Sequence, residues 1–222
     1  MTDVKLSIPL KFRRGSQREN QRASVDSALA QLDYLDAIRP IAGSTILDYG
    51  CGVKLTQSLY ERDSPQRLYV GLDVYRQMIE YMQERLQSDP KYSYATVNFQ
   101  NSMYNPDGIR MTADSMLPID DQHFDIITLF SVITHMQPED VRAILQILRH
   151  YASNDTLLLF STFIDDSQSE DFVDENSERP LLRARYRRSF IEGITHDAGW
   201  RIEALRRPIS GVIQHHLLCY PA

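Results

Sequence analysis

The stretch that decides the fold reads Thr45-Ile-Leu-Asp-Tyr-Gly-Cys-Gly52, a short apolar run that ends in two closely spaced glycines. An apolar run of this length predicts a buried β-strand, and a helical pattern follows it through Tyr60. In open α/β sheets, ligands bind beyond the carboxyl ends of the strands, where glycine lets the backbone come close to a ligand. The loop at 48–52 is therefore the first candidate binding site.

Strand and helix patterns alternate along the rest of the chain. We expect further strands at 68–73, 92–99, 124–130, 156–163, 200–205 and 212–220, and helices at 28–38, 75–87, from 138 onward and at 189–198. Ser189 followed by Glu192 predicts a capping box at the start of the last helix. The alternation predicts a doubly wound α/β fold, in which helices cover both faces of a mostly parallel sheet.

Composition narrows the class of protein. The net charge of -6 and the pI near 5.5 disfavour a broad positive surface for nucleic acid. No apolar run approaches the roughly 20 residues that span a bilayer. Cys51 and Cys219 lie far apart, and no histidine set has metal-ligand spacing. We therefore expect a cytoplasmic protein that binds neither a metal, nor nucleic acid, nor a membrane.

The residues after the next strands indicate which nucleotide the loop binds. Asp73 ends the second strand, where an acid can accept hydrogen bonds from a ribose diol, and the segment 114–118 precedes the fourth. A dinucleotide-binding loop requires a third glycine at position 55, which is leucine, and a P-loop requires Gly-Lys-Ser/Thr. What remains is a nucleoside without phosphates.

Four segments taken together resemble, in order, the motifs of class I methyltransferases, which use S-adenosylmethionine. They are Ile46-Leu-Asp-Tyr-Gly-Cys-Gly52, Val70-Gly-Leu-Asp73, Asp114-Ser-Met-Leu-Pro118 and Phe124-Asp-Ile-Ile-Thr-Leu-Phe-Ser-Val-Ile-Thr-His-Met136. The resemblance covers about residues 25 to 220 and implies a seven-stranded sheet with an antiparallel last strand. The sequence departs from the family at Lys54, where many relatives have a third glycine.

The resemblance also implies a set of cofactor-binding residues. The loop would surround the methionine part of S-adenosylmethionine, the second strand end would hold the ribose, and the segment before the fourth strand would contact the adenine. The end of the fourth strand would line the methyl-transfer site. The implied residues are Asp48, Tyr49, Gly50, Cys51, Gly52, Asp73, Val74, Asp114, Ser115, Met116, Phe130 and Ser131.

Three histidines are candidate catalytic bases. His135 follows the fourth strand, where it can act on a hydroxyl or an amine, or can be a structural histidine below the next helix. His215 and His216 are neighbours on a strand, so one of them faces inward, and that one is the second candidate. The inward histidine can equally satisfy a buried polar network.

The chain is expected to form an N-terminal arm at 1–24 and a single methyltransferase domain at 25–222. Within the domain, 165–188 is expected to be a loop or a lid insertion, since seven acids at 165–178 precede five arginines at 179–188. A solvated, self-compensating loop is the simpler interpretation. As a lid, its acids would suit a cationic amine.

The function we expect is methyl transfer to O, N or C of a small-molecule acceptor, with S-adenosylhomocysteine as product, by a monomer or a homodimer. Three alternatives stay open. They are a protein or RNA methyltransferase, a non-catalytic S-adenosylmethionine-binding regulatory protein, and a nicotinamide-dependent oxidoreductase on the related doubly wound fold.

Overall fold

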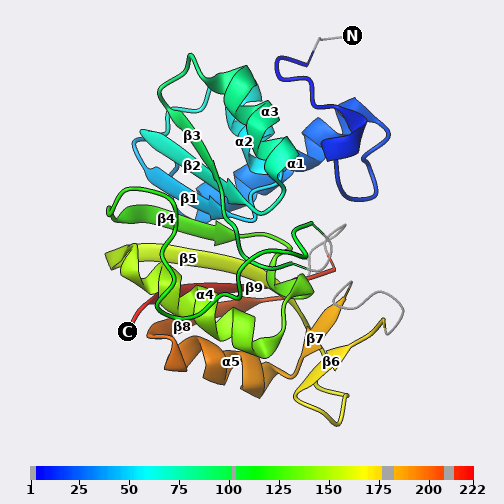
Figure 1. The fold of residues 1–222 in the computed structure, drawn as a ribbon, viewed down its shortest axis with the longest axis vertical. Helices are drawn as coiled ribbons and strands as arrows, with labels where there is room; N and C mark the ends of the chain where they lie inside the picture. The colour runs from blue at the N-terminus through cyan, green and yellow to red at the C-terminus, as the bar shows by residue number, and fades with distance from the viewer. Residues whose placement is uncertain (1–3, 102–103, 177–182, 208–212) are drawn as a thin grey trace. The chain divides into compact units, whose positions relative to one another are not determined.

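The computed structural model describes residues 4–101, 104–176, 183–207 and 213–222 (Figure 1). Parts of the expected arm, of the expected loop at 165–188 and of the expected last strand lie outside these residues. The chain divides into two compact units, Met1–Thr96 and Val97–Ala222, which are described in turn.

The first unit contains three parallel strands in the order β3-β2-β1. They are β1 (Thr45–Tyr49), β2 (Leu68–Asp73) and β3 (Tyr92–Thr96), accompanied by α1 (Gln21–Ile38), α2 (Lys54–Glu61) and α3 (Arg76–Leu86). Every residue of β1 is buried, including the polar Thr45 and Asp48, as expected for an interior strand of a parallel sheet. Helix α1 contacts α2, whereas α3 contacts β2 and β3. The expected strands and helices of this unit are confirmed, but α1 begins at Gln21 instead of residue 28, and β3 ends at Thr96 instead of residue 99.

The described part of the expected N-terminal arm is packed against the helices of this unit. It contains a short 3-10 helix, η1 (Leu10–Phe12), and it buries Leu6, Ile8 and Phe12. Gln57 of α2 donates a hydrogen bond to the Leu6 carbonyl at 2.8 Å, and Tyr81 of α3 donates one to the Ser7 carbonyl at 2.6 Å. The segment that precedes α1 is therefore an integral part of the first unit.

The second unit is built on a parallel pair that is extended by antiparallel strands. Its elements are β4 (Phe124–Leu129), η2 (Ile133–His135), α4 (Pro138–His150), β5 (Ala152–Ile164), β6 (Phe172–Asp174), β7 (Ala184–Tyr186), α5 (Arg188–Asp197), β8 (Trp200–Arg206) and β9 (His215–Pro221). Strand β4 is parallel to β5, β9 is antiparallel to β5, and β8 is antiparallel to β9. Figure 1 shows α4 and α5 side by side, and the fully buried Trp200 donates a hydrogen bond to the Leu145 carbonyl of α4 at 2.9 Å.

The expected loop at 165–188 contains a small hairpin in its described part. Strands β6 and β7 are antiparallel to each other, and β7 continues alongside the end of β5, with Phe163 opposite Arg185. Tyr186 is buried and donates a hydrogen bond to the Met136 carbonyl at 2.6 Å. The described remainder of the segment is thus anchored to the core of its unit by a strand pairing and by a buried tyrosine.

The predicted capping box is wrong. Helix α5 begins at Arg188, and its N-cap residue Arg187 makes no side-chain cap. The Arg188 amide instead donates a hydrogen bond to the Asp166 carboxylate at 2.8 Å, and Glu192 binds the Arg188 guanidinium at 2.7 Å. A carboxylate from a neighbouring loop therefore caps the helix, a contact that no local sequence pattern encodes.

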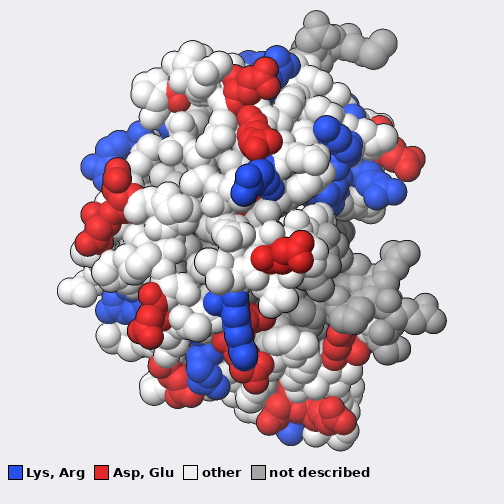
Figure 2. Space-filling model, viewed as in Figure 1, with Lys and Arg blue, Asp and Glu red and all other residues white. Residues whose placement is uncertain are grey.

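The fold class is confirmed as mixed α/β, with parallel strands and antiparallel C-terminal strands. The described residues supply the seven expected strands, β1 to β5, β8 and β9, and add the β6–β7 pair. On the face drawn in Figure 2, acidic and basic side chains are interspersed over the described surface. Among the described helices, none combines the length and apolar character needed to cross a membrane.

Candidate cofactor and acceptor sites

The glycine turn of the first unit follows β1 and is held by backbone hydrogen bonds. Gly50 and Gly52 have positive φ angles of 67° and 51°, which side chains other than glycine rarely adopt. The amides of Gly50 and Cys51 both donate to the Leu72 carbonyl, at 2.7 and 3.0 Å. The turn therefore bends sharply toward the end of β2, as the two glycines predict.

Asp73 ties this turn to the start of α3. Its Oδ2 accepts a hydrogen bond from the Gly52 amide at 3.0 Å, and its Oδ1 accepts one from the Tyr75 amide at 2.9 Å. Burial raises the pKa of Asp73, while the backbone amides and the Arg14 guanidinium oppose that shift. A carboxylate has about four lone-pair positions, and three backbone amides, those of Gly52, Val74 and Tyr75, favour its charge, so the side chain can also accept a hydrogen bond from a ribose diol.

Asp48, by contrast, faces the interior of the unit. It is 2% exposed, and its Oδ2 accepts a hydrogen bond from the Tyr69 hydroxyl at 2.8 Å. Burial, with Asp73 and Asp48 nearby, raises the pKa of the Cys51 thiol. A buried, protonated thiol is not a nucleophile. Of the other predicted residues here, Tyr49 is buried and Val74 is half-buried.

Gly71 is a residue of this region that the sequence reasoning missed. It lies opposite Asp48 in the register of β1 and β2. A Cβ at this position would come within 2.8 Å of the Tyr94 ring and 3.1 Å of the Cys51 Sγ. The available signal was a glycine inside an otherwise apolar strand, which often marks a close approach.

In the second unit, Ser131 follows β4 with a strained backbone. It is a non-glycine residue with a φ of 59°, and such strain gathers at functional sites. Its amide donates to the Ser161 Oγ at 2.8 Å, and both serine hydroxyls donate to the Gln214 Oε1, at 3.0 Å from Ser131 and 2.6 Å from Ser161. Because Oε1 accepts twice, the Gln214 amide nitrogen is left as a hydrogen-bond donor. Sequence reasoning singled out neither Ser161 nor Gln214.

The two neighbouring histidines of β9 have different surroundings. His216 is 7% exposed, its ring meets that of Phe130 edge-on at 6.1 Å, and burial lowers its pKa to about 4. The His215 Nδ1 accepts a hydrogen bond from the Ile164 amide at 3.4 Å, and burial, followed by Arg207, lowers its pKa. Both rings are therefore neutral at neutral pH, and His215 carries its proton on Nε2.

The remaining predicted residues of this unit lie on short, irregular segments. His135 ends η2 and is half-buried. Asp114 is exposed, and Met116 is 61% exposed. The Ser115 Oγ accepts a hydrogen bond from the Thr112 amide at 3.0 Å and so closes a turn. The segment around Ser115 thus presents an acid and a thioether at the surface.

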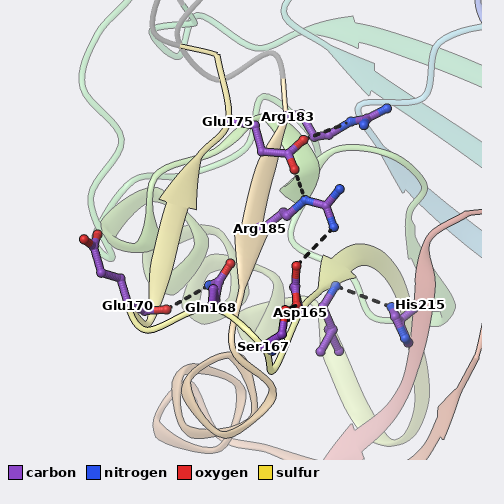
Figure 3. A network of polar contacts seen from close by, with 9 residues as sticks. Asp165, Ser167, Gln168, Glu170, Glu175, Arg183, Arg185 and His215 are labelled. Carbon is purple, nitrogen blue, oxygen red and sulfur yellow. Dashed lines mark hydrogen bonds and ion pairs between the residues drawn. The ribbon is translucent and has the colours of Figure 1, made fainter.

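The acids and arginines around the β6–β7 hairpin neutralise one another (Figure 3). Glu175 pairs with Arg185 and with Arg183, the latter at 3.5 Å, and Asp165 pairs with Arg185 at 3.5 Å. The guanidinium groups of Arg183 and Arg185 lie 5.1 and 5.8 Å from the centre of the Phe163 ring. This favours the self-compensating interpretation of the segment over a free acidic surface for a cationic amine. Among the described residues, no group of His, Cys, Asp and Glu is arranged to hold a metal ion.

Comparison with known families identifies the class of this protein. The profile of a methyltransferase domain family matches residues 18–205, which is most of the chain. The match includes the glycine turn, Asp73, the end of β4 and the hairpin. The chain belongs to this methyltransferase family.

Solved structures share the fold. Magnesium protoporphyrin IX methyltransferase from Synechocystis, with bound S-adenosylmethionine, has a TM-score of 0.59 and 17% identity, over 95% of this chain and 86% of that one. An S-adenosylmethionine-dependent methyltransferase from Mesorhizobium loti has a TM-score of 0.61 and 15% identity, over 88% and 99%. The glycopeptide N-methyltransferase MtfA, with bound S-adenosylmethionine, has a TM-score of 0.58 and 10% identity, over 88% and 94%. These likenesses confirm the expected class I fold.

Proposed function

We propose that this methyltransferase uses S-adenosylmethionine to methylate a small-molecule acceptor. The observation that carries the cofactor assignment is Asp73, whose carboxylate fixes the Gly52 and Tyr75 amides at the end of β2 and keeps acceptor capacity for a ribose hydroxyl. The folds that resemble this chain include structures that contain S-adenosylmethionine or S-adenosylhomocysteine. The turn also lacks the third glycine of a dinucleotide site, because position 55 is leucine.

Each predicted residue then has a role that its surroundings permit. Gly50 and Gly52 expose backbone to the methionine part, since neither carries a side chain. Asp48 and Tyr49 act by holding the turn from below, as both are buried. Asp114, Ser115 and Met116 are proposed for the adenine, and Phe130 with Ser131 for the reacting methyl group. S-adenosylmethionine, when bound, would supply a methyl group on a sulfonium: the acceptor would bond to the methyl carbon in line as the carbon–sulfur bond breaks, and S-adenosylhomocysteine would leave.

The chain contributes to this displacement mainly by alignment and by exclusion of water. His135 is the first candidate for a general base, where the acceptor begins protonated. His216 is a poorer candidate, because a pKa of about 4 makes it a weak base. The Nδ1 of His215 accepts a hydrogen bond from the Ile164 amide, so the proton of the neutral ring is on Nε2, which is a donor. His215 and the Gln214 amide therefore suit an oxygen atom of the acceptor that needs hydrogen-bond donors.

A small molecule is favoured as acceptor on two grounds. The net charge of -6 disfavours a polyanion as acceptor. Asp165 and Glu175 near the hairpin already pair with arginines of the same unit, so these two carboxylates do not form a free acidic surface for a large partner. Two proteins with a similar fold are, by name, methyltransferases of magnesium protoporphyrin IX and of a glycopeptide. A cytoplasmic location and a monomeric or homodimeric state stay predictions.

Calorimetry tests the cofactor, and a methylation assay tests the acceptor. The purified chain should bind S-adenosylhomocysteine and not NADH, and the reverse result would end the proposal. With methyl-labelled S-adenosylmethionine, label should enter members of a small-molecule panel and not bulk protein or RNA. Label in protein or RNA alone would replace the acceptor class, and cofactor binding without any transfer would support the regulatory alternative.

A further inference from the structure

Lys54 occupies an unusual position at the start of α2, two residues after Gly52 of the turn. It is partly buried, and its Nζ donates a hydrogen bond to the Ser27 Oγ of α1 at 3.1 Å. The ammonium group also lies beside Gly15, 3.6 Å from where a Cβ on that glycine would be. Three segments of the first unit, namely the N-terminal segment, α1 and α2, therefore surround this one cation.

The charge of Lys54 is not balanced by a carboxylate in the described part of the chain. None of its ion pairs or hydrogen bonds there involves an acid, whereas Arg185 of the β6–β7 hairpin, also partly buried, pairs with both Asp165 and Glu175. Burial lowers the pKa of Lys54 and is the sole cause of that shift. The free amides at the start of α2 add positive partial charge at the same place. An ammonium group in such surroundings is stabilised when an anion joins it.

The N-terminal segment brings a second cation to this region. The Arg14 guanidinium lies 5.8 Å from the centre of the Tyr75 ring and lowers the pKa of Asp73 at the end of β2. Residues 14 and 15 thus link the region of Asp73 to that of Lys54. Positive charge from Lys54 and from Arg14 therefore lies near the Gly52 end of the glycine turn, where Asp73 accepts a hydrogen bond from the Gly52 amide.

We propose that Lys54 binds the α-carboxylate of the methionine part of S-adenosylmethionine. This inference rests on the proposed function. The amino-acid end of that cofactor carries an ammonium group, a sulfonium and one carboxylate, and the carboxylate is the group that a lysine attracts. The position at which many relatives have a glycine is used here to add a charge-assisted hydrogen bond.

The test compares S-adenosylmethionine with decarboxylated S-adenosylmethionine, which keeps the adenosine, the sulfonium and the amine. Calorimetry on the wild-type chain should give about tenfold or greater preference for the carboxylated form. Lys54→Met should remove most of this preference, by weakening binding of S-adenosylmethionine and leaving binding of the decarboxylated form within about twofold. Lys54→Arg should retain the preference in part.

Lys91→Met is the matched control. Lys91 is also a partly buried lysine of the first unit that contacts a serine residue, through the Ser64 carbonyl at 3.5 Å, but it precedes β3 rather than following β1. This variant should keep the wild-type preference. Equal affinity of the wild-type chain for both compounds would overturn the inference, even where Lys54→Met fails to fold. An unchanged preference in Lys54→Met would also overturn it, whereas failure of the wild-type chain to bind either compound would overturn the proposed function itself.

Discussion

The glycine turn of the first unit and the Ser131–Gln214 region of the second are held by different kinds of hydrogen bond. In the turn, backbone amides of Gly50, Cys51 and Gly52 donate to one carbonyl and one carboxylate. In the second region, a serine amide, two hydroxyls and a glutamine side chain form a chain of neutral hydrogen bonds. Backbone amides are the same in every protein, whereas side chains vary. The glycine turn thus depends on backbone angles that glycine permits, whereas the Ser131–Gln214 region depends on the identity of its side chains.

Replacement of Asp73 should have the largest effect on the first region. Asp73→Ala leaves the Gly52 and Tyr75 amides without their acceptor and removes the proposed ribose contact. We expect affinity for S-adenosylhomocysteine to fall by about 1.5 to 3 kcal/mol, measured by calorimetry. The affinity of Asp73→Asn, which keeps one side-chain oxygen as an acceptor, should lie between those of the wild-type chain and of Asp73→Ala. An unchanged affinity in Asp73→Ala would remove the residue from the site.

A methyl group at Gly71 tests how tightly the first unit is packed. In Gly71→Ala the new Cβ would come within 2.8 Å of the Tyr94 ring, so the variant should lose about 1 to 3 kcal/mol of unfolding free energy. Gly193→Ala in α5 of the second unit is the control, because nothing lies within 4 Å of its Cβ. Helix propensity should stabilise that variant by up to about 1 kcal/mol. Urea denaturation measures the unfolding free energy of both variants. Equal changes in the two would show that Gly71 is not more tightly packed than Gly193.

Acid should weaken the second unit through His216. The folded-state pKa is about 4, below the usual value of 6.5, so the unfolded chain binds a proton first as the pH falls. The stability that the neutral ring contributes is present above about pH 6.5 and is lost progressively toward pH 4, by up to about 3 kcal/mol. His216→Gln should lower the melting temperature at neutral pH and flatten its fall in acid. An acid slope identical to that of wild type would contradict this.

The smallest effect is expected at the hairpin. Glu175→Gln removes the carboxylate shared by Arg183 and Arg185, on groups that are about one-third exposed. Unfolding free energy should fall by at most about 1 kcal/mol, and roughly 1 M salt should erase the difference by screening. Glu203→Gln, which affects one exposed pair with Arg201, should change less still. A loss that persists in high salt would indicate that the network is more than a solvated charge cluster.

Sequence predicted the first region well because its signals are local. The apolar run before Asp48, the glycines at 50 and 52 and the acid at the end of β2 each constrain a backbone of a few residues. The strands and helices could be predicted for the same reason, because their hydrophobic patterns are also local. The capping of α5 by Asp166 was beyond such reasoning, since the two partners are 22 residues apart and their meeting depends on the hairpin between them.

The sequence by itself determined the α/β class, the position of the glycine turn and the membership of the methyltransferase family. These depend on hydrophobic periodicity and on backbone angles that glycine alone adopts easily. The tertiary structure decided which side chains meet. It brought Gln214 to Ser131 across 83 residues, assigned the proton of His215 to Nε2, and placed Lys54 between α1 and Gly15. Contacts between residues far apart in the chain arise from packing, and packing is a property of the whole fold.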